Sequence, residues 1–129
     1  MNISEAAKRV QLPVKTVRYY SDIGLVEPSS RSTSGYRQYD EIALRKLTFI
    51  RRAREFGFSI SECRELIGLY QDNNRFSSDV KTIASKRLEE IKKKQVELQS
   101  LHDELANLVN ICQGDNQSNC PIIDSFSKS

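Results

Sequence analysis

The C-terminal part of the sequence contains two cysteines whose spacing suits metal binding. Residues 113–119 separate Cys112 from Cys120, and Pro121 follows directly. Two thiolates form a soft donor set for Cu(I), Ag(I) or Au(I), whereas a structural zinc ion needs four ligands and only Asp115 adds an obvious donor nearby. The pair therefore predicts a site for one monovalent ion per chain. A disulfide switched by redox state and two unrelated loop cysteines remain open as alternatives.

The third cysteine, Cys63, falls on the apolar side of a helical pattern and is predicted to be a packing residue. Three cysteines in a chain that we expect in the cytoplasm do not indicate a disulfide framework, because that compartment keeps thiols reduced. No basic residue neighbours Cys112 or Cys120 in the sequence to favour a thiolate, which argues against the redox alternative.

A second group of residues, near the N-terminus, has the chemistry of a nucleic-acid contact. Residues 1–54 contain 11 Lys and Arg against 5 Asp and Glu, whereas residues 55–129 contain 9 against 12. Lysine and arginine neutralise phosphates, and tyrosine hydroxyls bond to the sugar-phosphate backbone. One of the adjacent Tyr19 and Tyr20 is expected in the core, because neighbours on a helix point about 100° apart. The predicted DNA contacts are Lys15, Thr16, Arg18, Tyr19, Tyr20, Arg31, Tyr36 and Arg37.

These basic residues lie on elements that together predict a winged helix-turn-helix. Ser4 is the expected N-cap of a first short helix, and a second helix runs from about residue 14 to 23 and stops at Gly24, so the helix-turn-helix covers about residues 4–23. Ser34 and Gly35 form a turn signal between strand-compatible stretches, which predicts a basic hairpin, the wing, over about residues 29–39.

Two further helices and one long helix complete the expected fold. Asp40 caps a helix that runs to about Phe56, and residues 59–62 form a capping box that opens the next helix. From about residue 78 to 112 a heptad pattern follows, which indicates a coiled coil with a second copy of the chain. Its d positions are Ala84, Ile91, Leu98, Leu105 and Cys112, and its a positions are Leu88, Gln95, His102 and Val109.

We therefore expect a mainly α fold in three parts. Residues 1–70 form the winged helix-turn-helix, residues 71–111 the dimerisation helix, and residues 112–129 the metal-binding loop with a short C-terminal helix. No apolar run is long enough to span a membrane and the N-terminus lacks the features of a signal peptide, so we expect a cytoplasmic protein without a membrane partner. The motifs of serine hydrolases, P-loop enzymes and C-x-x-C oxidoreductases are missing, which argues against an enzyme.

In this order of elements the chain resembles the MerR family of bacterial transcription regulators. The similarity covers almost the whole sequence and is carried by residues 2–4, 17–20, 24–26, 35–39 and 54–58. Residues 77–81 and the segment from Cys112 through Gly114, Asp115 and Cys120 to Ile123 resemble the copper-efflux regulators of the CueR type.

The resemblance implies a homodimer with antiparallel long helices that binds promoter DNA and activates copper-efflux genes by distorting that DNA for RNA polymerase. It adds Arg54 to the DNA contacts. It also implies that Ser77 replaces a cysteine with which relatives bind divalent ions, and that Lys81 neutralises the charge left by two thiolates on Cu(I). The alternative for Lys81 is that it is an ordinary solvated lysine. The alternative for the whole chain is an architectural or protein-interaction module without a metal.

Overall fold

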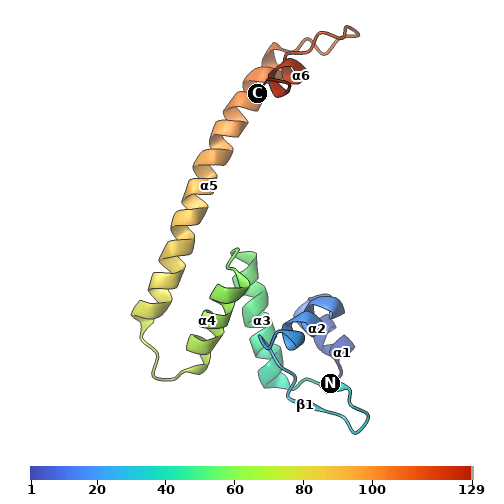
Figure 1. The fold of residues 1–129 in the computed structure, drawn as a ribbon, viewed down its shortest axis with the longest axis vertical. Coiled ribbons are helices and arrows are strands. Elements are labelled where there is room, and N and C mark those ends of the chain that lie inside the picture. The colour runs from blue at the N-terminus through green and yellow to red at the C-terminus, as the bar shows by residue number, and fades with distance from the viewer. Residues whose placement is uncertain (129) are drawn as a thin grey trace. The chain divides into compact units, whose positions relative to one another are not determined.

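The computed structural model describes residues 1–128, and Ser129, the last residue of the predicted segment 112–129, lies outside the described residues. The described part is mainly helical, which confirms the predicted fold class, and it forms two compact units, Met1–Ala84 and a second unit that begins at Ser85. Figure 1 shows the elements in chain order. They are α1 (Ile3–Val10), α2 (Val14–Asp22), β1 (Ser30–Arg31), β2 (Arg37–Gln38), α3 (Glu41–Glu55), α4 (Ile60–Gln71), α5 (Ser77–Ile111) and α6 (Pro121–Phe126).

The helix-turn-helix begins earlier than predicted. The N-cap of α1 is Asn2, whose side-chain oxygen accepts a hydrogen bond from the Glu5 N–H at 2.9 Å. The prediction of Ser4 as the cap is therefore wrong, because Ser4 already lies in the first turn of α1. The second helix, α2, follows Pro13 and ends before Gly24, whose φ of 71° is a backbone conformation that favours glycine.

The predicted wing is an antiparallel hairpin. Strands β1 and β2 pair Ser30 with Gln38 and Arg31 with Arg37, and Gly35 turns the chain with a φ of 85°. The N-terminal residues extend this small sheet, since the Tyr39 N–H donates to the Met1 carbonyl at 2.7 Å and the Met1 amino group donates to the Tyr39 carbonyl at 2.9 Å. The wing is thereby held against the beginning of α1.

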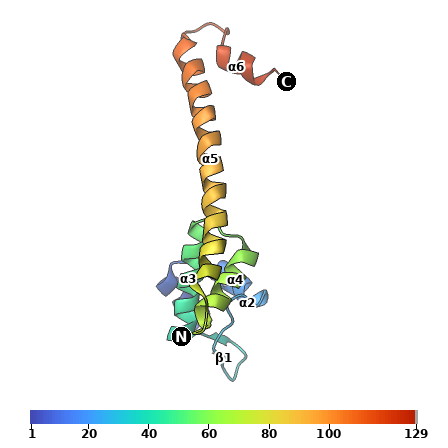
Figure 2. The same cartoon turned by 90° about the vertical axis from the view of Figure 1, so that its left-hand side faces the viewer.

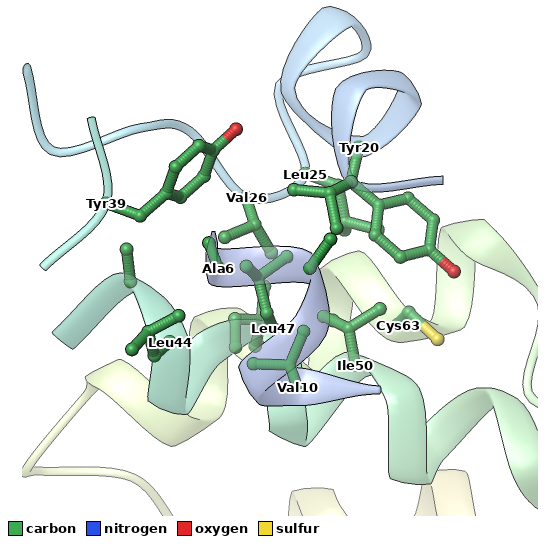
Figure 3. Packing of buried hydrophobic residues seen from close by; sticks show 14 of the residues in the cluster. Ala6, Val10, Tyr20, Leu25, Val26, Tyr39, Leu44, Leu47, Ile50 and Cys63 are labelled. Atoms are coloured by element: carbon green, nitrogen blue, oxygen red, sulfur yellow. The ribbon is translucent and has the colours of Figure 1, made fainter. Parts of the chain in front are cut away.

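The caps predicted for α3 and α4 are present. Asp40 accepts a hydrogen bond from the Ala43 N–H, and this bond lowers the pKa of the Asp40 carboxyl. Ser59 and Glu62 form the reciprocal capping box of α4. The core of the first unit consists of side chains from α1 to α4 and the segments between them, with Tyr20, Ile50 and Cys63 on one side and Tyr39 on the other (Figure 3).

The long helix α5 begins and ends one residue before the predicted bounds and contains 35 residues (Figure 2). None of its described residues is buried. At its beginning, Val80 and Ile83 are partly buried against the core of the first unit. No helix within residues 1–128 is both long and apolar enough to cross a membrane.

Candidate DNA-binding surface and metal-binding loop

A groove of about 530 Å³ lies between the beginning of α1, the helix α2 and the wing. It brings Arg18 of α2 together with Arg31, Tyr36 and Arg37 of the wing. Arg18, Arg31 and Tyr36 are exposed, and the Tyr36 side chain is 71% accessible. Three guanidinium groups and a phenol around one hollow form a surface suited to the phosphates of nucleic acid.

The wing is tied to α2 by Arg37. Its guanidinium donates to the Asp22 carboxylate at 2.7 Å and to the Ser21 hydroxyl at 3.1 Å. Because its side chain is only 21% exposed, much of its donor capacity is used inside the protein. Arg37 therefore positions the wing beside α2, in addition to the DNA contact predicted for it. The sequence did not predict Ser21 and Asp22 as partners of Arg37, because the register of the hairpin decides which residues of α2 the Arg37 side chain reaches.

The remaining residues predicted on α2 differ in exposure. Lys15 is exposed, Thr16 is half-buried, and the Tyr19 side chain is 50% accessible, so all three present surface outside the groove. Tyr20 is only 5% accessible and its ring belongs to the core, which confirms that one of the two adjacent tyrosines is a packing residue. Tyr20 is also a predicted DNA contact. Its ring packs in the core near Arg54 of α3 and Cys63 of α4, and its contact with DNA stays a prediction.

Arg54, near the end of α3, is an exposed residue with two internal partners. It donates a hydrogen bond to the Phe58 carbonyl at 2.7 Å and interacts with the Tyr20 hydroxyl. Burial raises the pKa of Tyr20, and the Arg54 guanidinium partly offsets that rise. Arg54 thus holds the turn between α3 and α4 against α2. In the predicted DNA contact, the same guanidinium would bind both these internal partners and DNA.

The two loop cysteines lie next to each other. Cys112 directly follows α5, Cys120 is the N-cap of α6, and both are half-buried free thiols. Between them the chain turns at Gly114, with a φ of 64°, and at Asp115, whose carboxylate accepts a hydrogen bond from the Gln117 N–H at 2.9 Å. The loop therefore returns Cys120 to the end of α5, where the Cys112 side chain hydrogen-bonds to it.

The surroundings of Cys120 favour its thiolate. The backbone N–H groups of Ile123 and then Ile122 lower the pKa of Cys120, as does the hydrogen bond with Cys112, while partial burial and the Asp124 carboxylate act in the opposite direction. These N–H groups belong to the first turn of α6, although the thiol makes no cap hydrogen bond of regular geometry. No basic residue next to Cys120 in the sequence indicated a lowered pKa, and these two N–H groups were not predicted. Pro121 after the cysteine, a residue typical of a helix start, was the available signal.

The other two residues predicted at the metal site lie elsewhere in the chain. Ser77 is the first residue of α5 and Lys81 is an exposed residue in its second turn, whereas Cys112 follows the last residue of that helix. Within residues 1–128, no group of three or more His, Cys, Asp or Glu side chains is arranged to hold a metal ion.

Cys63 is fully buried in the core, as predicted for a packing residue. Its thiol donates weakly to the Phe58 carbonyl, with a sulfur–oxygen distance of 3.8 Å, and burial raises its pKa. It is therefore chemically separate from the exposed loop that carries Cys112 and Cys120.

A winged helix-turn-helix with a basic groove, followed by a long helix without buried residues and a two-cysteine loop, is the architecture of a DNA-binding regulator. Comparison with known proteins agrees. The family model described as MerR HTH family regulatory protein matches residues 1–68, and the model described as MerR, DNA binding matches residues 44–108. The chain belongs to the MerR family, whose members are DNA-binding transcription regulators.

Two bacterial transcription regulators are similar to this chain over almost their full length. The regulator HmrR of Rhizobium leguminosarum bv. viciae is 47% identical, with 98% of both chains covered. The regulator CueR of Salmonella typhimurium LT2 is 45% identical, with 98% of this chain and 92% of that protein covered. Among solved structures, PbrR691 of Ralstonia metallidurans CH34 in complex with lead(II) has a TM-score of 0.79 and 31% identity, with 98% of this chain and 99% of that chain covered.

Proposed function

We propose that the protein is a Cu(I)-responsive transcriptional activator that acts in the cytoplasm as a homodimer and controls genes for copper efflux or resistance. The observation that carries this proposal is the contact between the Cys112 and Cys120 thiols in a loop where backbone N–H groups lower the pKa of Cys120. Two soft donors without a third protein ligand suit a monovalent ion with few ligands better than Zn(II). Ag(I) and Au(I) suit the same pair.

The charge of such a site supports roles for residues at the beginning of α5. Two thiolates around a monovalent ion leave one net negative charge, which is costly to bury unless it is offset. The N–H groups of Ile122 and Ile123 supply part of the compensation. We propose that Lys81 of the partner subunit supplies the rest, and that Ser77 of the partner subunit leaves the site without a third thiolate. PbrR691 binds lead(II), so within this family the donor set of each chain has to select its own ion.

The exposed apolar residues of α5 support the homodimer. Leu88, Leu98, Leu105 and Val109, all at predicted a or d positions, are between 47% and 64% accessible in the single chain. A helix with such a stripe and no buried residue requires a partner, and a second copy of the same helix is the simplest one. An antiparallel pair is the arrangement that would bring residues 77–81 of one chain toward the loop of the other.

For the DNA-bound state we propose that α2 enters the major groove and that the wing holds the adjacent phosphates. Its contacts are Lys15, Thr16, Arg18, Tyr19, Arg31, Tyr36, Arg37 and Arg54, with Tyr20 limited to its hydroxyl. The dimer binds its operator with and without metal. Metal binding favours a second shape of the complex, in which the bent and underwound promoter admits RNA polymerase.

The contact between the two free thiols also favours a second candidate, a disulfide switch through the same residues. A thiol with a lowered pKa next to a second thiol is what disulfide formation needs. Strictly anaerobic transcription separates the two mechanisms, because activation by Cu(I) without an oxidant excludes a required disulfide.

Cysteine substitutions test the proposal in a run-off assay on a promoter fragment selected by its binding to the protein. Cys112→Ser and Cys120→Ser should each abolish the increase in transcript caused by Cu(I) while operator binding is retained. Cys63→Ala, which removes the buried thiol outside the loop, is the matched control and should respond as the wild type does. Copper induction that persists in the Cys112→Ser/Cys120→Ser double variant would overturn the proposal.

A further inference from the structure

The C-terminal end of α2 lacks stabilising charges of its own. Its last turn contains no basic residue and ends on the acidic Asp22, which is unfavourable next to the partial negative charge of a helix C-terminus. Backbone N–H groups of residues 23–25 bond to the carbonyls of Tyr19, Tyr20 and Ser21, so what this end of α2 lacks is a positive charge. Since α2 is the helix proposed to enter the major groove, groups that hold this end determine how α2 is presented to DNA.

Two arginines from other parts of the first unit bind this end. Arg37 of the wing pairs with Asp22, as described above. Arg64 of α4 donates from its two terminal nitrogens to the carbonyls of Ile23 and Gly24, at 3.0 and 3.3 Å. These bonds join residues 40 and 41 positions apart, so they connect α4 directly to the end of α2. The guanidinium thus fixes the two carbonyls that directly follow α2 and places a positive charge next to the negative end of the helix.

The helix that carries Arg64 also leads into the dimerisation helix. A short segment, residues 72–76, joins α4 to α5, and Arg75 braces it by donating from its side chain to the Asp72 carbonyl at 3.2 Å. Val80 and Ile83 of α5 pack against the core that includes Cys63, the neighbour of Arg64 in α4. These contacts connect the beginning of α5, through the core and α4, to Arg64 and the end of α2.

We infer that Arg64 is a positioning residue that couples the dimerisation helix to the DNA-reading helix. It need not touch DNA or metal. Its role in the response to metal rests on the proposed function, whereas its hold on the end of α2 does not. The inference predicts that loss of Arg64 weakens the link between metal binding and promoter distortion and leaves both binding steps in place.

The test uses the full-length protein with Arg64→Met, which keeps the length of the apolar stem and removes the donors and the charge. The matched control is Arg45→Met on α3, an exposed arginine with no hydrogen bond or ion pair within residues 1–128. Amide hydrogen exchange of the free protein over residues 19–26 should be about threefold faster in Arg64→Met than in Arg45→Met, the size expected for one charge at a helix C-terminus. Arg64→Lys, which keeps the charge, should fall between them.

The same variants are then compared in run-off transcription with and without Cu(I). Arg64→Met should lower the ratio of metal-induced to basal transcript by about threefold, with operator affinity and bound copper per chain equal to those of Arg45→Met. Equal exchange rates in the two methionine variants, or an unchanged ratio, would overturn the inference. A wild-type protein that shows no induction would refute the proposed function instead, and the exchange comparison would still decide whether Arg64 holds α2.

Discussion

The apolar stripe on α5 allows a quantitative prediction for dimer stability. Leu98, at a predicted d position, is 64% accessible in the single chain, and this surface would be covered in a coiled coil. Truncation to alanine removes three carbons, worth about 2.4 kcal/mol if fully buried, so covering 64% of that surface contributes about 1.5 kcal/mol per chain. Twofold symmetry doubles the loss to about 3 kcal/mol, which raises the dimer Kd by about 100-fold.

Val96 provides the matched control for this prediction. It lies on the same helix and is 67% accessible, but the heptad places it away from the a and d positions. Sedimentation equilibrium of Leu98→Ala, Val96→Ala and wild type should show the large increase in Kd for Leu98→Ala and a change of less than about threefold for Val96→Ala. An equal effect of the two substitutions, or a Leu98→Ala variant that dimerises as the wild type does, would refute the proposed seam.

Three further predictions concern the loop, the fold and the DNA surface. Because the pKa of Cys120 is lowered, iodoacetamide should label Cys120 in the folded metal-free protein at a lower pH than it labels an ordinary thiol. The pKa of the buried Cys63 is raised, so Cys63 should be labelled only after unfolding. Labelling of Cys120 that begins only at the pH at which an ordinary thiol reacts would contradict this prediction. Ser59→Ala breaks the capping box of α4 and should lower the free energy of unfolding by about 1 kcal/mol in urea denaturation, whereas Ser61→Ala, inside the first turn, should leave it nearly unchanged. Arg18→Ala removes one contact from each subunit of the proposed dimer and should reduce the slope of log K against log salt for operator binding by about two. An unchanged slope would remove Arg18 from the phosphate contacts.

Local signals were sufficient to predict most of the secondary structure. The capping box at Ser59 and the cap at Asp40 depend only on residues three positions apart, and both are present. The α1 cap shows the limit of such signals, because Asn2 and Ser4 are both capping residue types and only the backbone conformation selects Asn2. The heptad pattern located α5 to within one residue at each end.

Features that depend on packing between distant segments could not be predicted in this way. The sequence predicts that one of Tyr19 and Tyr20 is buried but not which one, and the packing of α2 on the core decides that it is Tyr20. The hydrogen bonds of Arg64 to Ile23 and Gly24 join residues 41 and 40 positions apart in the sequence, so no local sequence pattern indicates them. The thiolate-stabilising N–H groups of Ile122 and Ile123 act on Cys120 only because α6 starts directly after it.

The central claim, that two thiolates select a monovalent ion and thereby activate transcription, is tested most directly by one metal panel. Anaerobic run-off transcription with wild-type protein is measured with Cu(I), Ag(I), Au(I), Zn(II) and Pb(II) at equal free concentrations. The account predicts an increase in transcript with the monovalent ions and none with the divalent ions, because two thiolates suit a monovalent ion with few ligands, whereas Zn(II) needs further protein ligands. Activation by Zn(II) or Pb(II) equal to that by Cu(I) would contradict it.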